Sequence, residues 1–227
     1  MDSPTPSPPL SATTEASASA TAGGAASPAR RLAAGAAAAG LGASMASVTA
    51  LAVARPDLRL AHDAISEYVH GPFGYVQTLV FLVVAASSAV VAALLPVAGR
   101  ATAGRWMRLG LLVWAAGMAL GGAIDVEDAV AGTDSGAVHN VVVKVAFVAL
   151  AGSMVAACRR PGASAFPRPG SRLWSLVLLV TLVGSATLEG MPLFGTVQRI
   201  LATTAVLWLV TVALDIRAAA CDSPPGS

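Results

Sequence analysis

Six long apolar runs, separated by short segments that carry most of the charges, constrain the fold of this chain more than any other feature of its sequence. A helix needs about 20 mainly apolar residues to cross a hydrocarbon core of about 30 Å, and the runs approach or exceed that length. Only 11% of the residues are charged, against about 25% in soluble domains. We therefore predict an all-α, polytopic membrane protein with six transmembrane helices. The predicted spans are residues 32–54, 72–98, 106–124, 137–158, 173–188 and 194–216.

The segment before the first run, residues 1–29, consists of Ser, Thr, Pro, Ala and Gly with almost no bulky apolar side chain, which predicts a disordered tail. Arg30 and Arg31 precede the first run as in a twin-arginine signal peptide, and Ala54 ends a small-residue motif that resembles a cleavage site. The run is longer than the roughly 7–15 apolar residues of a signal peptide, which favours a membrane span. We expect a six-helix domain over residues 30–217 and a short polar tail over residues 218–227.

The distribution of charge predicts the orientation of the spans. Six spans place both tails on the same side, and ten of the fourteen basic residues fall on that side. The positive-inside rule then makes this side cytoplasmic in the cell membrane. The opposite side is acidic and holds every histidine. A net charge of +2 is too small to indicate binding to nucleic acid.

Residues 55–77 form the longest polar segment between two apolar runs. On a helix, its polar side chains would share an arc of about 140°, which predicts an extracytoplasmic amphipathic segment between the first two spans. A solvated interfacial face is the alternative interpretation. The polar face comprises Arg59, His62, Asp63, Ser66, Glu67 and His70.

Further polar residues lie within or near the outer ends of the spans, where an unpaired charge is costly. Lys144 could extend outward to the headgroups or face the bundle interior beside a carboxylate, and Arg199 is expected to pair with Glu189. Gln77 and Gln198 are also conspicuous. The predicted ligand-binding residues are His62, Ser66, Glu67, His70, Asp125, His139, Asn140, Lys144, Glu189 and Arg199.

The possibility of a metal site depends on the histidines. Glu67 and His70 have a Glu-x-x-His spacing, which places a carboxylate and an imidazole on one helical face, and His139 is a third candidate ligand. A single divalent metal is therefore conceivable, although no cofactor is predicted. Cys158 and Cys221 show neither a CxxC nor a Cys/His spacing. No familiar catalytic signature is present, so no catalytic residue is predicted.

Several short motifs resemble the bacterial integral membrane family catalogued as domain of unknown function 998. They are residues 62–81 with the core Ile65-Ser66-Glu67-Tyr68, the pair His139-Asn140, and Gly195-Thr196-Val197-Gln198-Arg199 with Trp208 beyond it. The resemblance covers about residues 30–217 and implies a six-helix membrane protein without a known activity. A more distant similarity is to seven-helix metal-dependent membrane hydrolases that use a Ser, an Asp and three His. This chain has Ser66, Asp125 and three His, but it lacks a seventh span and the His-x-x-x-His pair.

Two functions follow as hypotheses. In the first, an outward-facing polar cluster in the lipid bilayer binds a lipid headgroup or small ligand, and Glu67, His70, Asp125 and His139 belong to one site. In the second, the protein is an outward-facing metal-dependent hydrolase acting on lipid, with His62, His70 and His139 as ligands and Glu67 or Asp125 as acid/base. Transport would require polar residues through the inner half of the spans as well, and these are lacking.

Overall fold

The computed structural model describes residues 28–95, 102–124, 134–158, 170–189 and 191–221, and in these ranges the structure is helical without strands. Most of the predicted tails therefore lies outside the described residues, although the first helix already begins at Pro28. The elements are α2 (Pro28–Ala54), the 3₁₀ helix η2 (Ile65–Val69), α3 (Gly74–Leu94), α4 (Thr102–Ala123), α6 (Asp134–Cys158), α7 (Gly170–Thr187) and α8 (Phe194–Ala219).

Each predicted span coincides with one α-helix. Helices α2, α3, α4, α6 and α8 are long and apolar enough to cross a membrane, whereas α7 contains a shorter apolar helix over Arg172–Thr187. Large apolar side chains are exposed along the bundle, as expected where lipid covers them; they include Leu79, Val113, Val148, Val180 and Leu207. The predicted all-α, multi-pass membrane fold is therefore confirmed.

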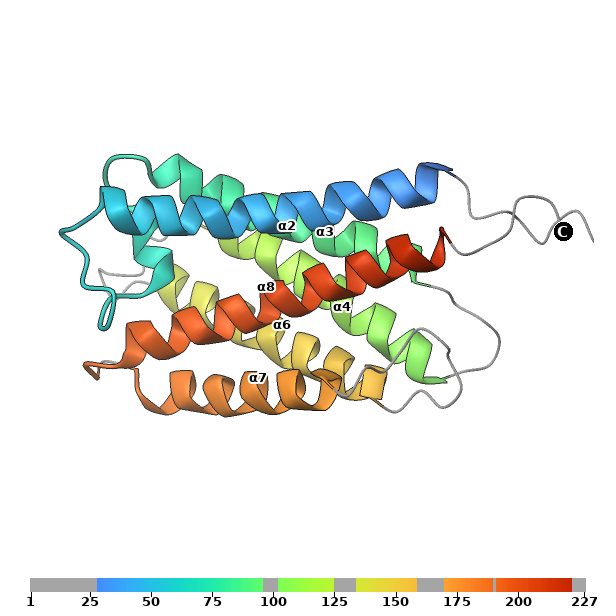
Figure 1. Ribbon diagram of the computed structural model, residues 1–227. Coiled ribbons are helices and arrows are strands. Elements are labelled where there is room, and N and C mark those ends of the chain that lie inside the picture. Colours follow the sequence, from blue (N-terminus) through green and yellow to red (C-terminus); the bar gives the residue numbers. More distant parts are fainter. Residues whose placement is uncertain (1–27, 96–101, 125–133, 159–169, 190, 222–227) are drawn as a thin grey trace, which may run out of the picture.

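The helices form a ring in chain order (Figure 1). Each packs against the next, from α2 through α3, α4, α6 and α7 to α8, and α8 returns to pack against α2. The beginning of α2 and the end of α8 lie at the same end of the bundle, here named the terminus end. The other end, here named the loop end, carries residues 55–73, which we name the connector. Both ends of the helical domain thus lie at one end of the bundle, and the prediction that they face the cytoplasm stays a prediction.

Helices α3, α4 and α6, which are neighbours in the ring, pack closely against one another. A Cβ atom built on Gly117 of α4 would lie 2.5 Å from the Cβ atom of Ala146 of α6, so the absence of a side chain permits this approach. Nearby, the rings of Trp114 and Phe147 meet edge to face with centroids 4.9 Å apart. The indole Nε1 of Trp114 donates to Ser88 Oγ of α3 at 3.0 Å. Helices α3, α4 and α6 therefore form a well-packed unit.

The connector does not form the predicted amphipathic helix. It consists of turns and the five-residue helix η2. Its own side chains accept hydrogen bonds from backbone groups that a longer helix would use, which is how Asp and Glu compete with helical structure. Asp63 accepts from the Arg59 N–H at 2.6 Å, and Glu67 accepts from the Ala64 N–H at 3.0 Å. From α8, Gln198 Oε1 accepts from the Ile65 N–H at 2.7 Å, so tertiary contacts complete the fold of the connector.

Candidate functional site

The ring encloses a cavity of about 280 Å³ at the loop end. Its walls come from α2, α3, α4, α6, α8 and the connector, whereas α7 contributes no lining residue. The cavity reaches the surface, since three of its lining residues are exposed: Thr49, Leu60 and Asn140. The polar residues that could position a ligand are Ser66, Gln77, His139, Asn140, Gln198 and Arg199.

Polarity changes with depth in this cavity. On each of three helices, a polar lining residue near the loop end is followed, roughly seven residues deeper, by an apolar one. At 1.5 Å per residue this corresponds to about 10 Å along the helix axis. The pairs are Gln77 and Val84 on α3, His139 and Phe147 on α6, and Arg199 and Val206 on α8. On these three helices the lining is therefore more polar at the loop end than inside the bundle. On α2 the order is reversed, because Ser44 lies deeper than Ala52.

Two side chains at the polar end are buried with unused hydrogen-bonding atoms. Gln77 is 1% exposed and His139 is 4% exposed. Gln77 Oε1 and His139 Nδ1 have no hydrogen-bond partner among the described residues. The His139 ring forms a hydrogen bond with the Gly121 backbone and meets the Phe81 ring edge to face at 6.4 Å. A buried polar atom without a partner costs about 1–3 kcal/mol, so these two side chains lower the stability of the protein.

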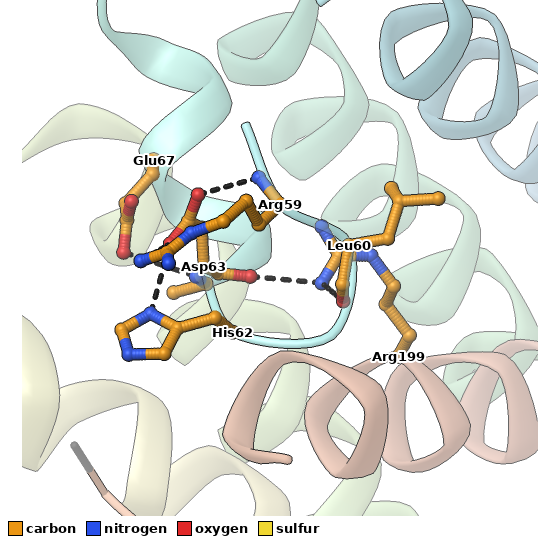
Figure 2. A network of polar contacts seen from close by, with 7 residues as sticks. Arg59, Leu60, His62, Asp63, Glu67 and Arg199 are labelled. Atoms are coloured by element: carbon orange, nitrogen blue, oxygen red, sulfur yellow. Dashed lines mark hydrogen bonds and ion pairs between the residues drawn. The ribbon is translucent and has the colours of Figure 1, made fainter. Parts of the chain in front are cut away.

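Arg199 joins α8 to the connector (Figure 2). Its Nη1 donates to the Leu60 carbonyl at 2.6 Å and to the Asp63 carbonyl at 2.8 Å. Its Nη2 donates to the Tyr68 hydroxyl at 3.1 Å, and the guanidinium lies 5.6 Å from the centroid of that ring. Gly195, one turn earlier, leaves space for the connector, since a Cβ there would lie 2.5 Å from the Asp63 carbonyl oxygen. Arg199 therefore lines the cavity and also holds the connector, which covers the cavity at the loop end.

The predicted ion pair between Arg199 and Glu189 is wrong. Glu189 accepts instead from Lys144 Nζ at 3.0 Å, and both side chains are about half exposed. In the part of the chain that the structure describes, no carboxylate pairs with Arg199. The physical reason is that the connector occupies the space beside Arg199 with backbone carbonyls, while Glu189 lies within reach of α6. The expectation that Lys144 has a carboxylate partner is confirmed, but the pair lies on the surface.

Ionisable groups of the connector stabilise its turns. The buried Arg55 pairs with Asp57 at 2.8 Å and donates to the His70 carbonyl. This side-chain hydrogen bond from Arg55 lowers the pKa of Asp57. The Arg59 N–H likewise lowers the pKa of Asp63, and His62 Nδ1 lies 3.0 Å from the Asp63 carboxylate. Figure 2 shows His62, Asp63 and Arg59 together. These contacts indicate a structural role for the connector carboxylates.

The structure separates the predicted site residues into two groups. The cavity lining includes Ser66, His139, Asn140 and Arg199. It does not include His62, Glu67, His70, Lys144 and Glu189. Asp125 lies outside the described residues. Glu67 and His70 therefore do not share this cavity with His139, although His70 has its own buried nitrogen, Nε2, with no partner among the described residues.

Sequence reasoning did not identify the apolar wall of the cavity or the role of Tyr68. Trp114 and Phe147 lie in apolar runs that look like ordinary core, and no pattern distinguishes a side chain that lines a cavity from one that fills it. Tyr68 is fully buried and binds Arg199. Its place in the family-like motif was the only available signal. Gln77 and Gln198 stood out as polar residues near span ends, and both line the cavity.

The single divalent metal that the sequence leaves open is not a prediction, and it stays untested. Within the described ranges, no three His, Cys, Asp or Glu side chains gather in a group that could hold a metal ion. Of the candidates Glu67, His70 and His139, Glu67 accepts from the Ala64 N–H and His139 bonds to the Gly121 backbone. The acidic loop containing Asp125 is outside the described residues.

Comparison with known proteins identifies a family. The family model described as "Protein of unknown function (DUF998)" matches residues 17–215, and the chain therefore belongs to that family. No curated protein matches the chain, and no solved structure matches it.

Proposed function

We propose that this DUF998 protein binds an amphiphile in the cavity of its ring, with a lipid headgroup or the polar part of a small ligand at the loop end. The observation that carries this proposal is the change from polar to apolar lining with depth on α3, α6 and α8. A ligand with one polar and one apolar end would match both. The polar lining residues Ser66, Asn140, Gln198 and Arg199 lie at the end where its polar group would sit.

The volume limits the part of the ligand that enters. Pockets for drug-sized molecules span roughly 300–1,000 Å³, and this cavity of about 280 Å³ is near the lower bound. It can hold a headgroup or a single short chain, but not a complete two-chain lipid. The remainder of a lipid would lie outside the cavity.

Binding is better supported than hydrolysis. A metal-dependent hydrolase needs several imidazole or carboxylate ligands around one ion. Of the described lining residues, only His139 is a histidine, and none is an aspartate or glutamate. We also propose that the loop end faces away from the cytoplasm, because the basic residues near the terminus-end tips of the described helices favour a cytoplasmic terminus end; they are Arg30, Arg31, Arg105, Arg108, Arg172 and Arg217.

The proposal is tested by filling the cavity. Ala202 lines it, so Ala202→Phe should occupy part of the volume and reduce binding of lipids that remain bound to the purified protein, as measured by native mass spectrometry. Ala218→Phe is the matched control, because it adds the same ring to an exposed position of the same helix. Val143→Trp provides a second filling variant if the first does not fold.

The expected result is lipid adducts on the wild type and on Ala218→Phe, with a loss of several-fold on a folded filling variant. Two results would overturn the proposal: a wild type that binds no amphiphile, or a folded filling variant that binds as well as the wild type. Circular dichroism and size-exclusion chromatography establish that each variant is folded.

A further inference from the structure

A groove of about 550 Å³ runs along the outer surface of the ring between α4 and α6. Its walls come from residues 103–113 at the beginning of α4 and from residues 149–156 near the end of α6, so it lies in the half of the bundle nearer the terminus end (Figure 1). Every described residue that lines it is apolar or glycine, and none of them is buried. The groove shares no lining residue with the cavity at the loop end and is therefore a separate feature.

Two glycines shape this groove in different ways. Helices α4 and α6 approach closely at Gly110, where an added Cβ would lie 2.1 Å from Ser153 Oγ. On α6, Gly152 leaves the groove open, because a Cβ there would have no atom within 4 Å. Ser153 itself is buried and donates to the carbonyls of Met107 at 3.2 Å and Ala149 at 3.0 Å. The groove thus offers space and an apolar surface, which suits a hydrocarbon chain.

The length of the groove matches one leaflet of a bilayer. Residues 103–113 extend over about 15 Å along the axis of α4 at 1.5 Å per residue, and half of a hydrocarbon core of about 30 Å is the same length. The apolar span of α4 begins at Ala103, so the groove starts where hydrocarbon meets the headgroups. Trp106 lines this end with 61% of its surface exposed, which is typical of aromatic residues at a membrane interface.

Positive charge lies beside this end of the groove. Arg105 is exposed and Arg108 is half-buried, and no carboxylate among the described residues pairs with either. An arginine near the end of a span has a side chain long enough to reach the headgroups. A second copy of the chain is a poorer occupant of the groove. Two copies related by a two-fold axis have the same orientation in a membrane, so their Arg105 side chains would lie at the same level across the interface and repel.

We infer that this groove binds an anionic phospholipid, with one acyl chain between α4 and α6 and the phosphate near Arg105. The Trp106 indole N–H is a donor for a headgroup oxygen at the same level. This site lies at the opposite end of the bundle from the cavity, and the inference does not rest on the proposed function.

Two lipids with identical chains test the charge: dioleoyl phosphatidylglycerol is anionic, and dioleoyl phosphatidylcholine is zwitterionic. Binding of each to the full chain in detergent is measured by native mass spectrometry titration. Gly152→Leu fills the groove. Gly42→Leu is the matched control, because Gly42 of α2 is also exposed and a Cβ there would also have no atom within 4 Å.

The wild type should bind one phosphatidylglycerol about fivefold more tightly than phosphatidylcholine, which is the effect of one cation near a membrane surface. Gly152→Leu should lose this lipid, whereas Gly42→Leu should retain it. Arg105→Gln should remove most of the preference, and Arg31→Gln, which changes an exposed arginine of α2, should not. Ala202→Phe fills the cavity at the loop end and should leave this lipid bound.

Three results would overturn the inference. The first is equal binding of the two lipids by the wild type. The second is loss of phosphatidylglycerol from Ala202→Phe but not from Gly152→Leu, which would place the lipid in the cavity and support the proposed function instead. The third is a wild-type dimer that only Gly152→Leu dissociates, because the groove would then hold a second copy. The comparison of the two lipids on the wild type is decisive even if a variant does not fold.

Discussion

Replacing Arg199 by Gln should lower the unfolding free energy far more than breaking the exposed ion pair between Lys144 and Glu189. The guanidinium holds the connector to α8 through the carbonyls of Leu60 and Asp63 and through the Tyr68 hydroxyl. Glutamine is shorter and uncharged, so it cannot reach these three acceptors together. The connector would then no longer be held to the start of α8 at this position.

The magnitude follows from the interactions that the guanidinium makes. A hydrogen bond to a charged group contributes about 1.5–3 kcal/mol when buried, and a partly exposed cation–π interaction about 0.5–1 kcal/mol. Arg199 is half-buried and its interactions are not additive, so we expect the unfolding free energy to fall by about 2–4 kcal/mol in total. Glu189→Gln breaks an exposed pair with Lys144, which is worth about 0.2–1 kcal/mol.

The assay is reversible unfolding of the purified protein in mixed micelles, with a denaturing detergent as titrant and helical circular dichroism as the signal. Double-mutant cycles assign the interactions. Arg199→Gln and Tyr68→Phe should couple by at least about 0.5 kcal/mol, because their side chains share a hydrogen bond. Arg199→Gln and Glu189→Gln should be additive within about 0.5 kcal/mol, because the two do not interact. Equal losses of stability from the Arg199 and Glu189 substitutions, or strong coupling between them, would refute this assignment.

Three further predictions concern packing, pH and topology. Gly195→Ala should cost about 1–3 kcal/mol of unfolding free energy, because the new Cβ would meet connector carbonyls. Gly42→Ala is the control and should be neutral or stabilising, because a Cβ there has nothing within 4 Å. Equal effects of the two substitutions would contradict this packing. The Arg59 N–H lowers the pKa of Asp63 from 3.8. The contribution of Asp63 to the unfolding free energy should therefore persist from pH 7 to about pH 4 and disappear as the pH falls further. If Asp63→Asn lost stability below about pH 4 in the same way as the wild type, Asp63 would not be the group responsible. A membrane-impermeant maleimide should label neither Cys158 nor Cys221 in intact cells, whereas in permeabilised cells the exposed Cys221 should react first; strong labelling of intact cells would reverse the orientation.

The helical framework could be predicted because the length of an apolar run directly reflects the thickness of the membrane. The predicted span at residues 137–158 lies within α6, which begins three residues earlier at Asp134. The run at residues 173–188 is shorter than the others, and α7 contains the short apolar helix of the bundle. Antiparallel neighbours joined by short loops then determine most of the ring order.

The connector and the ion pairs could not be predicted in the same way. A period of 3.6 residues shows which side chains would share a face if a helix formed, but not whether other groups take over its hydrogen bonds. Asp63 and Glu67 bind nearby backbone N–H groups instead. Sequence separation also gives no information about partners such as Arg199 and Leu60, which are brought together by the closure of the ring.

Part of the candidate site was visible from the sequence because polar residues are costly in a span and therefore conspicuous. His139 and Arg199 were identified for this reason, and both line the cavity. Glu67 and His70 were identified from their spacing on a helix that does not form, and they lie outside the lining. A polar residue in a span was thus an imperfect indicator as well, because Lys144 was identified in the same way and lies outside the lining.

The structure links the stability of the connector to the cavity beneath it. Leu60, Ile65 and Ser66 of the connector line the cavity, and α8 holds this cover with two consecutive side chains. Gln198 binds the Ile65 N–H, Arg199 binds the Leu60 carbonyl, and both side chains also line the cavity. A ligand that contacts this lining would bind the folded connector and not the unfolded one, and would therefore raise the unfolding free energy by mass action. Arg199→Gln should consequently reduce both the stability of the free protein and the additional stability gained from a bound amphiphile.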